Sequence, residues 1–445
     1  MFIFMSEFSH LISEKNFKQL RQWFHENGTL EIVEELTRSD PEQRAIAFRL
    51  IPKARAIDVF EMTDPSVQQQ ILNILREPRA REILEELEPD DRARLLDEMP
   101  PLLAKKLLEG LSFKERRLTS LLLGYPENSV GRIMSPEFVE LEKNMTANEA
   151  IAKVRSSGRG VEAIYSLPVI DQNHKFIGII DLGDLLMADC NITTEKLLTE
   201  EAYSVKADES QEKASRLLLD LGLIALPVVD SEEKLVGVLT FDDAMEVLQE
   251  SDTEDYLRTG ASEPLREPYL TASMLRLTKT RAVWLLVLAL AATLTVNVLN
   301  FFQSTLESVL TLSLFIPLLI GIGGNIGSQS ATIIIRAMAL GEIRFGDTGA
   351  VLFREIRVGA LLGLVLGIMG FIFVSIVFGI NMAIVLSLSL FSIAVLAAFA
   401  GSLLPMTAKK IGIDPAVVSA PIISTLVDAS GLIIYFLIAK MVLSI

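Results

Sequence analysis

Asp428 is a carboxylate in a place where a charge is costly. It lies near the middle of residues 415–439, an apolar run that contains no other charge. Such a run is predicted to cross a bilayer, which takes about 20 apolar residues, and an aspartate at its centre costs about 2.5 to 3.5 kcal/mol. Pro421, two turns earlier, should free the backbone carbonyl of Val417. We therefore expect Asp428 to face protein or water, as a cation ligand or as a polar contact between helices.

A second polar feature is a glycine-rich stretch in the uncharged run of residues 308–335. Pro317, which should free the carbonyl of Ser313, is followed at residues 321–329 by Gly-Ile-Gly-Gly-Asn-Ile-Gly-Ser-Gln. The glycines let the chain unwind or let a neighbouring helix approach closely. Carboxylate, carbonyl and amide oxygens without thiol or imidazole suit magnesium, calcium or manganese. The pattern indicates either a hard-cation pathway or a glycine-rich packing seam.

A third group of candidate residues is an acidic run ahead of the first apolar segment. Its members are Glu246, Glu250, Asp252, Glu254 and Asp255, on a segment with helical periodicity. Such a run is either a solvated helix face or a place where a divalent cation relieves repulsion between carboxylates. In the second case the cation concentration would set how compact the surrounding domains are.

The elements that must position these residues in the membrane follow from the uncharged runs. These runs are residues 282–302, 308–335, 358–408, which is long enough for two helices with a turn at 379–381, and 415–439. Five spanning helices are therefore predicted. The connections 336–357 and 409–414 carry Arg or Lys, whereas those around 303–307 and 379–382 carry neither. This asymmetry predicts cytosolic N-terminal domains and a C-terminus on the outside.

Charge divides the chain into an acidic front and an apolar back. Residues 281–445 hold eight Lys/Arg and six Asp/Glu, which leaves 33 Lys/Arg and 51 Asp/Glu for residues 1–280, a net charge of −18 there. Such a front repels nucleic acid and attracts cations. The single Cys190 excludes an intramolecular disulfide. The three histidines are scattered, and neither a Ser/His/Asp nor a Cys/His pattern is visible, so the sequence does not predict an enzyme.

Two internal repeats organise the front. The pairs Asp40-Pro41, Asp64-Pro65 and Glu88-Pro89 recur every 24 residues, and Ser112 continues the phase. An acid before a first-turn proline predicts helix starts, and repeated helical hairpins predict a small α-solenoid. A second repeat has an offset of 59 residues, since Leu-Pro-Val-Ile-Asp at residues 167–171 matches Leu-Pro-Val-Val-Asp at 226–230.

The second repeat resembles the paired CBS domain, a regulatory module that often binds adenine nucleotides between its two copies. Each copy reads as a strand, a turn, a second strand and a helix opened by an aspartate, which is Asp184 or Asp243. The resemblance implies that ATP could bind with Asp184 near its ribose, although Gly183 stands where nucleotide-binding copies favour a polar or basic residue.

The combination of these parts with Pro317, the glycine-rich stretch and Asp428 resembles the MgtE family of bacterial magnesium channels over nearly the whole chain. The family implies a multidomain membrane protein whose parts are a helical N domain (1–130), two CBS copies (131–195 and 196–249), an acidic connecting helix with its linker (250–280) and a five-helix transmembrane domain (281–445). It implies a homodimer in the inner membrane whose pore is lined by the second and fifth helices. Gly324, Asn325 and Asp428 would form the pore site for hydrated Mg²⁺.

The resemblance also implies that Mg²⁺ bound among the soluble domains closes the pore. Carried over by position, the sensor acids are Asp58, Asp90, Glu212, Asp243, Glu246, Glu254 and Asp255. The chain departs from some relatives at Arg94, Gly222 and Ser251, where acids occur in them. Two other functions stay open, namely a coupled carrier of magnesium, manganese or cobalt and a membrane-anchored nucleotide sensor that conducts nothing.

Overall fold

The computed structural model describes residues 6–14, 16–75, 77–97, 99–158, 161, 163–199, 202–265, 269, 272–418 and 420–444. The chain forms two compact units. One comprises residues 1–251 with 266–272, and the other comprises residues 252–265 with 273–445. The boundary falls within a single helix, α15 (Phe241–Thr259), so the acidic run begins as the terminal helix of the second CBS copy.

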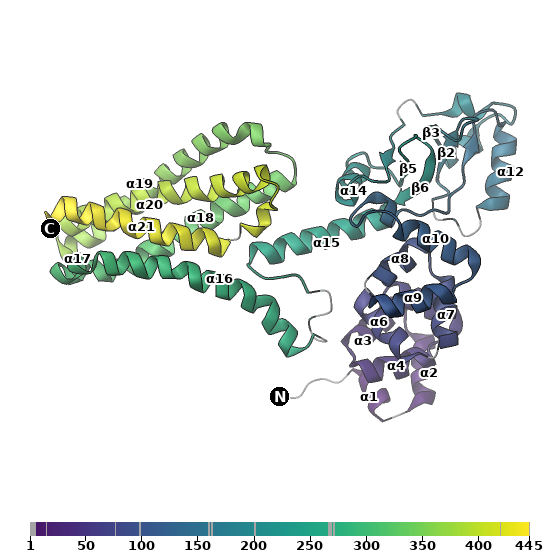
Figure 1. Ribbon diagram of the computed structural model, residues 1–445, viewed down its shortest axis with the longest axis horizontal. Coiled ribbons are helices and arrows are strands. Elements are labelled where there is room, and N and C mark those ends of the chain that lie inside the picture. The colour runs from purple at the N-terminus through teal and green to yellow at the C-terminus, as the bar shows by residue number, and fades with distance from the viewer. Residues whose placement is uncertain are drawn as a thin grey trace. The chain divides into compact units, whose positions relative to one another are not determined.

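The first part of the soluble unit is a stack of short helices (Figure 1). They are α1 (Glu7–Ser13), α2 (Phe17–Glu26), α3 (Thr29–Arg38), α4 (Pro41–Leu50), α5 (Lys53–Glu61), α6 (Pro65–Ile74), α7 (Glu77–Glu86), α8 (Pro89–Asp97), α9 (Pro101–Gly110) and α10 (Phe113–Leu123). The predicted 24-residue repeat is confirmed, because α4, α6 and α8 each begin at the repeated proline. Asp40 caps α4 by accepting the amides of Glu42 and Gln43, each at 3.0 Å.

One side chain in each repeat also joins consecutive helices. Arg44, Gln68 and Arg92 are buried and 24 residues apart, and each donates to backbone carbonyls at the end of the preceding helix. Arg44 Nε donates to Leu36 O at 2.7 Å, and Gln68 Nε2 donates to Phe60 O at 2.9 Å. The last carbonyls of a helix lack intrahelical donors, so these bonds satisfy groups that would otherwise be buried unpaired.

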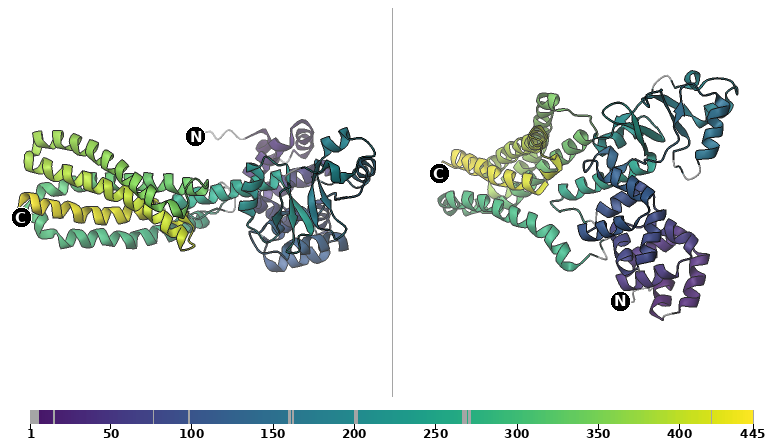
Figure 2. Two further views of the ribbon diagram at one scale, coloured as in Figure 1. Left: turned by 90° about the horizontal axis from the view of Figure 1, so that it is seen from above. Right: turned by 45° about the vertical axis from the view of Figure 1, so that its right-hand side comes forward.

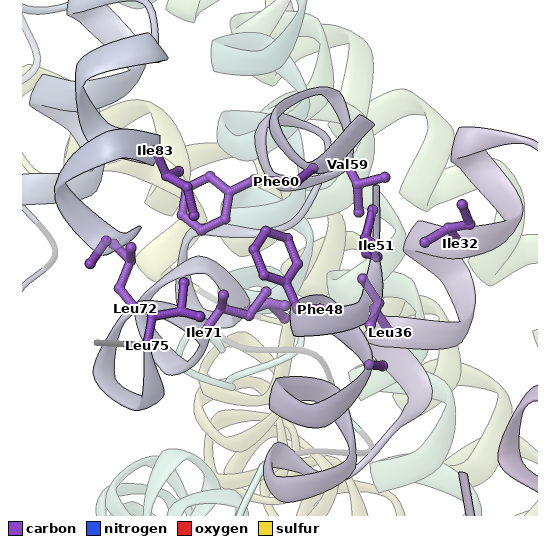
Figure 3. Close-up of a cluster of buried hydrophobic side chains, with 14 of the residues drawn as sticks. Ile32, Leu36, Phe48, Ile51, Val59, Phe60, Ile71, Leu72, Leu75 and Ile83 are labelled. Carbon is purple, nitrogen blue, oxygen red and sulfur yellow. The ribbon is translucent and has the colours of Figure 1, made fainter. Parts of the chain in front are cut away.

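The core of the stack is apolar and continuous across the repeats. Figure 3 shows Phe48 and Phe60 at its centre, with ring centroids 5.9 Å apart in an edge-to-face arrangement. Ile71 and Ile83 join them from α6 and α7, and Ile32 extends the cluster toward α3. Because each helix pair buries its apolar face only against its neighbours, the repeats are stable as a stack.

The second part of the soluble unit contains two small sheets with the same topology. Their strands, in the order in which they pair, are β1 (Leu141–Glu142), β2 (Ser166–Ile170) and β3 (Phe176–Asp181), then β4 (Val205–Lys206), β5 (Ala225–Val229) and β6 (Leu235–Thr240). The helices are α11 (Val130–Ile133), α12 (Ala147–Ser157), α13 (Leu182–Met187), η1 (Thr194–Leu197), α14 (Gln211–Asp220) and α15. Val169 pairs with Gly178 as Val228 pairs with Gly237, so the 59-residue repeat is confirmed in register.

Among its described residues, the membrane unit contains five helices that are long and apolar enough to span a bilayer, as predicted. They are α16 (Met274–Phe301), α18 (Ile316–Ala339), α19 (Thr348–Phe378), α20 (Ile380–Lys410) and α21 (Ala420–Leu443). Shorter elements connect them, which are α17 (Gln303–Ser308), η2 (Leu310–Phe315), η3 (Phe345–Asp347) and η4 (Pro415–Val417). The turn at Gly379 separates α19 from α20 where it was predicted, with φ at 87°.

The long helices run side by side, as both views in Figure 2 show for the green to yellow part of the chain. At one end of the bundle the last turns of α21 pack beside the connection that follows α16. Tyr435 Oη donates to Leu312 O at 2.9 Å, and Lys440 Nζ lies 5.6 Å from the centroid of the Phe302 ring. The C-terminal end of α21 and the C-terminal end of α16 therefore lie at the same end of the bundle.

Candidate functional site

The glycines of α18 let α21 approach closely. Gly323, Gly324 and Gly327 are buried, and side chains of α21 fill the space where their Cβ atoms would be. A Cβ atom on Gly327 would lie 3.0 Å from Cγ2 of Ile423, and one on Gly324 would overlap the hydroxyl of Ser424. The segment stays helical throughout. Of the two expected uses of the glycines, the structure therefore has close approach and not unwinding.

The expectation that Pro317 frees the carbonyl of Ser313 is wrong. Pro317 lies in the first turn of α18, and the carbonyl of Ser313 accepts the amide of Ile316 at the end of η2. Pro421 likewise lies in the first turn of α21. Proline is tolerated in a first turn because its missing amide would have had no intrahelical partner there. The carbonyl of Ser313 is thus not free to serve as a cation ligand.

Asp428 meets α18 at Gly324. A Cβ atom on Gly324 would lie 3.6 Å from Oδ1 of Asp428, which is an ordinary van der Waals contact, so the carboxylate lies directly beside this glycine. Oδ1 is buried and has no hydrogen-bond partner among the described residues. A small pocket beside it is otherwise apolar, lined by Leu319, Ile320, Ile393, Val427, Gly431 and Leu432. A carboxylate oxygen in such a setting needs water or a cation as its partner.

Asn325, the third predicted pore residue, points elsewhere in the single chain. It is exposed on α18, as are Gln329 and Thr332 at helical spacing from it. Amide and hydroxyl groups on a spanning helix are costly against lipid, because lipid offers no hydrogen bonds. This polar face of α18 therefore needs water or another protein surface to cover it.

In the soluble unit, two of the predicted sensor acids come together between α8 and the start of α15. Asp90 is only 5% exposed, and its Oδ1 is buried with no hydrogen-bond partner among the described residues. Asp243 accepts the hydroxyl of Thr240. Burial, and then the neighbouring charge of Asp91, raise the pKa of Asp90 to about 7. Burial and then Asp90 raise the pKa of Asp243 well above its usual range. The pair therefore binds a proton or a cation more readily than isolated carboxylates do.

The structure adds one acid that the sequence reasoning missed. Burial, and then the charges of Glu88, Asp91 and Asp58, together raise the pKa of Glu61 to about 7. Glu61 lies one turn after Asp58 on α5, so helical spacing from a predicted sensor acid was the signal that could have found it. Asp58 itself is exposed. Acids of α5 and α8 thus share one electrostatic environment.

Three other predicted sensor acids contact arginines. Glu212 pairs with Arg216 at 3.0 Å within α14, Glu246 pairs with Arg94, and Glu254 pairs with Arg258. Asp255 lies beside Glu254 on α15. Throughout the described ranges, no three His, Cys, Asp or Glu side chains are grouped so that they could hold a metal ion directly. The described sensor acids therefore do not form a closed chelate.

The remaining predicted residue, Asp184, is exposed in the first turn of α13. It occupies the position in the first CBS copy that Asp243 occupies in the second. The two equivalent aspartates therefore differ, since Asp243 contributes to the buried acid pair and Asp184 faces solvent.

Comparisons with known proteins match the N domain, both CBS copies and the part of the membrane unit from α18 to α21. The MgtE family model, described as a divalent cation transporter, matches residues 316–438, the MgtE intracellular N domain matches 28–128, and CBS domains match 130–191 and 195–250. The magnesium transporter MgtE of Thermus thermophilus is 36% identical over 333 residues, which cover 74% of this chain and 73% of that protein. That of Enterococcus faecalis is 31% identical, with 72% and 70% covered.

One solved structure resembles the soluble unit. It is the crystal structure of the cytosolic domain of the Mg²⁺ channel MgtE in complex with ATP. Its TM-score is 0.51 at 31% sequence identity, and the match covers 54% of this chain and 98% of that one.

Proposed function

Because this chain belongs to the MgtE family of divalent cation transporters, we propose that it is a magnesium-selective channel of the inner membrane. The observation that carries the proposal is the buried, unpartnered Oδ1 of Asp428, set against Gly324 inside a spanning helix. Magnesium loses its water reluctantly, so a pore that keeps the ion hydrated favours acceptors for the hydrogens of its water shell. Asp428 and the amide oxygen of Asn325 are such acceptors.

The working unit in this proposal is a homodimer. The exposed polar face of α18, with Asn325 and Gln329, supports it, because a second copy of the same face would cover these groups and enclose water between them. Two copies of Asp428 would then contribute a charge of −2 to one water-filled path. That charge attracts a divalent cation without requiring it to shed its water.

Mg²⁺ bound to the soluble acids closes the channel in this proposal. The buried pair Asp90 and Asp243 supports it most strongly, since both groups favour a neutralising partner. The other proposed sensor acids are Asp58, Glu212, Glu246, Glu254 and Asp255. Shifting a gate from 1:99 to 99:1 takes about 5.5 kcal/mol of differential binding, which several weak sites can supply together.

The proposed orientation has the soluble domains in the cytosol and the C-terminus outside. An odd number of spans supports it, as does the position of the last turns of α21 beside the far end of α16. Adenine nucleotide binding is a second proposed property, with Asp184 near the ribose. The ATP complex of the similar cytosolic domain favours it.

The experiment that tests the function is magnesium flux into proteoliposomes that contain the purified full-length chain. A channel conducts Mg²⁺ down its electrochemical gradient alone, and millimolar Mg²⁺ on the side of the soluble domains should stop the flux. Flux that requires a counter-ion or proton gradient would identify a coupled carrier instead. Tight ATP binding with no ion flux would identify a nucleotide sensor.

A further inference from the structure

Two arginines occupy places between carboxylates that lie far apart in the sequence. Arg94 of α8 contacts Oδ1 of Asp91 at 2.8 Å and also pairs with Glu246 of α15. Arg258, in the last turn of α15, pairs with Glu254 one turn earlier and contacts Oδ2 of Asp414 at 2.7 Å. The first set lies wholly within the soluble unit, and the second lies wholly within the membrane unit.

We propose that Arg94 and Arg258 are built-in cations that neutralise Glu246 and Glu254, two of the proposed sensor acids, while no Mg²⁺ is bound there, and that Arg258 latches α15 to the loop that leads into α21. This inference rests on the proposed function only where it says that the latch acts on channel gating. The latch itself is a property of the folded chain.

A guanidinium suits this role because it is always charged and offers several donors in a planar fork, so one arginine can bridge two carboxylates. Arg258 meets Glu254 in the favourable order along a helix, with the acid four residues before the base. The side chains of Arg258 and Asp414 are 30% and 33% exposed, so solvent screens their contact only in part. A tethered cation also stays in place when the free cation is removed.

Asp414 lies in the connection that leads into α21, so the latch acts on the helix that carries Asp428. Asp414 directly precedes η4, and α21 begins a few residues later. The helix that carries Asp428 is thus joined, through this short connection, to the end of the acidic helix α15. A second contact of the same kind supports the arrangement, because Arg336 at the end of α18 lies 3.3 Å from Asp252 of α15. Both helices at the Gly324–Asp428 site are therefore tied to α15 by ion pairs.

The latch is tested by hydrogen exchange on the full-length chain in nanodiscs, in buffer with EDTA. We expect Arg258→Gln to speed exchange of residues 252–259 about fivefold, the upper range for a partly exposed ion pair. Asp414→Asn should speed it by a smaller factor, because it leaves the pair of Arg258 with Glu254, and the double variant should add nothing to Arg258→Gln, which has already lost the contact with Asp414. Arg38→Gln, which removes only an exposed pair within α3 between Arg38 and Glu34, is the control. Unchanged exchange in both single variants, or additive effects in the double variant, would overturn the latch.

The role of Arg94 is tested by replacing its charge. In Arg94→Asp, residues 89–97 should exchange faster than in the wild type in EDTA, and added Mg²⁺ should restore their protection. In the wild type, Mg²⁺ should also protect them through Asp90, but by a smaller factor, because Arg94 already neutralises Asp91 and Glu246. If the variant is as protected as the wild type without Mg²⁺, Arg94 is not a built-in cation and that half of the proposal fails. Neither readout depends on flux, so a chain that conducts no Mg²⁺ would refute the proposed function while leaving this result to stand.

Discussion

Gly324 of α18 and Asp428 of α21 face each other so closely that a Cβ atom on the glycine would lie 3.6 Å from the aspartate Oδ1. That distance is an ordinary van der Waals contact, and the side chain that a Cβ atom on Gly324 would overlap is Ser424. We expect Gly324→Ala to destabilise the protein by about 1 to 3 kcal/mol, because the new methyl group overlaps Ser424. Thermal unfolding in detergent measures the change.

The matched control lies one turn earlier on the same helix. A Cβ atom on Gly321 would meet nothing within 4 Å, so Gly321→Ala should leave the melting temperature unchanged or raise it slightly. Adding Ser424→Gly to Gly324→Ala should recover most of the lost stability. If Gly321→Ala and Gly324→Ala changed the melting temperature equally, the close contact between Gly324 and Ser424 would not affect stability.

The acid pair predicts a dependence of stability on pH. Asp90 has a folded pKa of about 7, against about 3.9 when unfolded. The folded chain therefore holds more protons than the unfolded chain between these values, and stability falls as pH rises through this window. Without Mg²⁺ the melting temperature of the soluble unit should drop by on the order of 5 °C between pH 5.5 and pH 8. Asp90→Asn should flatten this slope, and a slope unchanged in that variant would contradict the assignment.

Magnesium should oppose the loss of stability that rising pH causes. Because Mg²⁺ competes with protons for the ionised pair, it should raise the melting temperature more at pH 8 than at pH 6. This difference should shrink in Asp243→Asn. Scanning fluorimetry of the full-length protein in magnesium titrations at the two pH values measures both effects.

Replacing Arg44 should strongly destabilise the N domain. Its fully buried guanidinium donates to the carbonyls of Leu36, Thr37 and Ser39. Arg44→Met keeps much of the packing volume but leaves these carbonyls without their donor. We expect the free energy of unfolding of the N domain to fall by about 2 to 4 kcal/mol, as measured by unfolding in denaturant. Arg38→Met, at an exposed position of α3, should change stability by less than about 0.5 kcal/mol.

The proposed topology can be tested by labelling single cysteines in intact cells. With Cys190 replaced by serine, cysteines at Ser304 and Asn381 should react with an impermeant reagent, because both positions are exposed at the outer connections. A cysteine at the exposed Gly346 should react only after the membrane is permeabilised. The reverse pattern would place the soluble domains outside.

Much of the fold could be predicted from local patterns. The repeated acid-proline pairs located the starts of α4, α6 and α8, because a capping residue and a first-turn proline act within a few residues of each other. Pro317 also lies in the first turn of a helix, but the sequence was interpreted as having it inside one. The uncharged run that contains it also includes η2, and hydropathy alone does not mark where a helix begins inside an apolar run.

The site could be predicted less completely, because its key contacts join distant parts of the chain. Asp428 could be identified from the cost of its charge in an apolar run, and Gly324 from its place in the glycine-rich stretch. The pairing of Arg258 with Asp414 could not, because these residues are 156 positions apart and only the folded chain brings them together. Helical spacing from Asp58 could have pointed to Glu61, but the burial that raises its pKa arises only in the folded chain.

The central claim is that Asp428 is the charge that draws Mg²⁺ through the membrane domain. The most direct measurement compares magnesium flux into proteoliposomes for the wild type, Asp428→Asn and Asp428→Glu at equal protein content. Asparagine keeps the shape and removes the charge, so we expect flux to fall by at least about tenfold, while Asp428→Glu keeps partial flux. All three proteins should elute alike in size-exclusion chromatography. Wild-type flux in Asp428→Asn would contradict the account, and the ion path would then have to lie elsewhere.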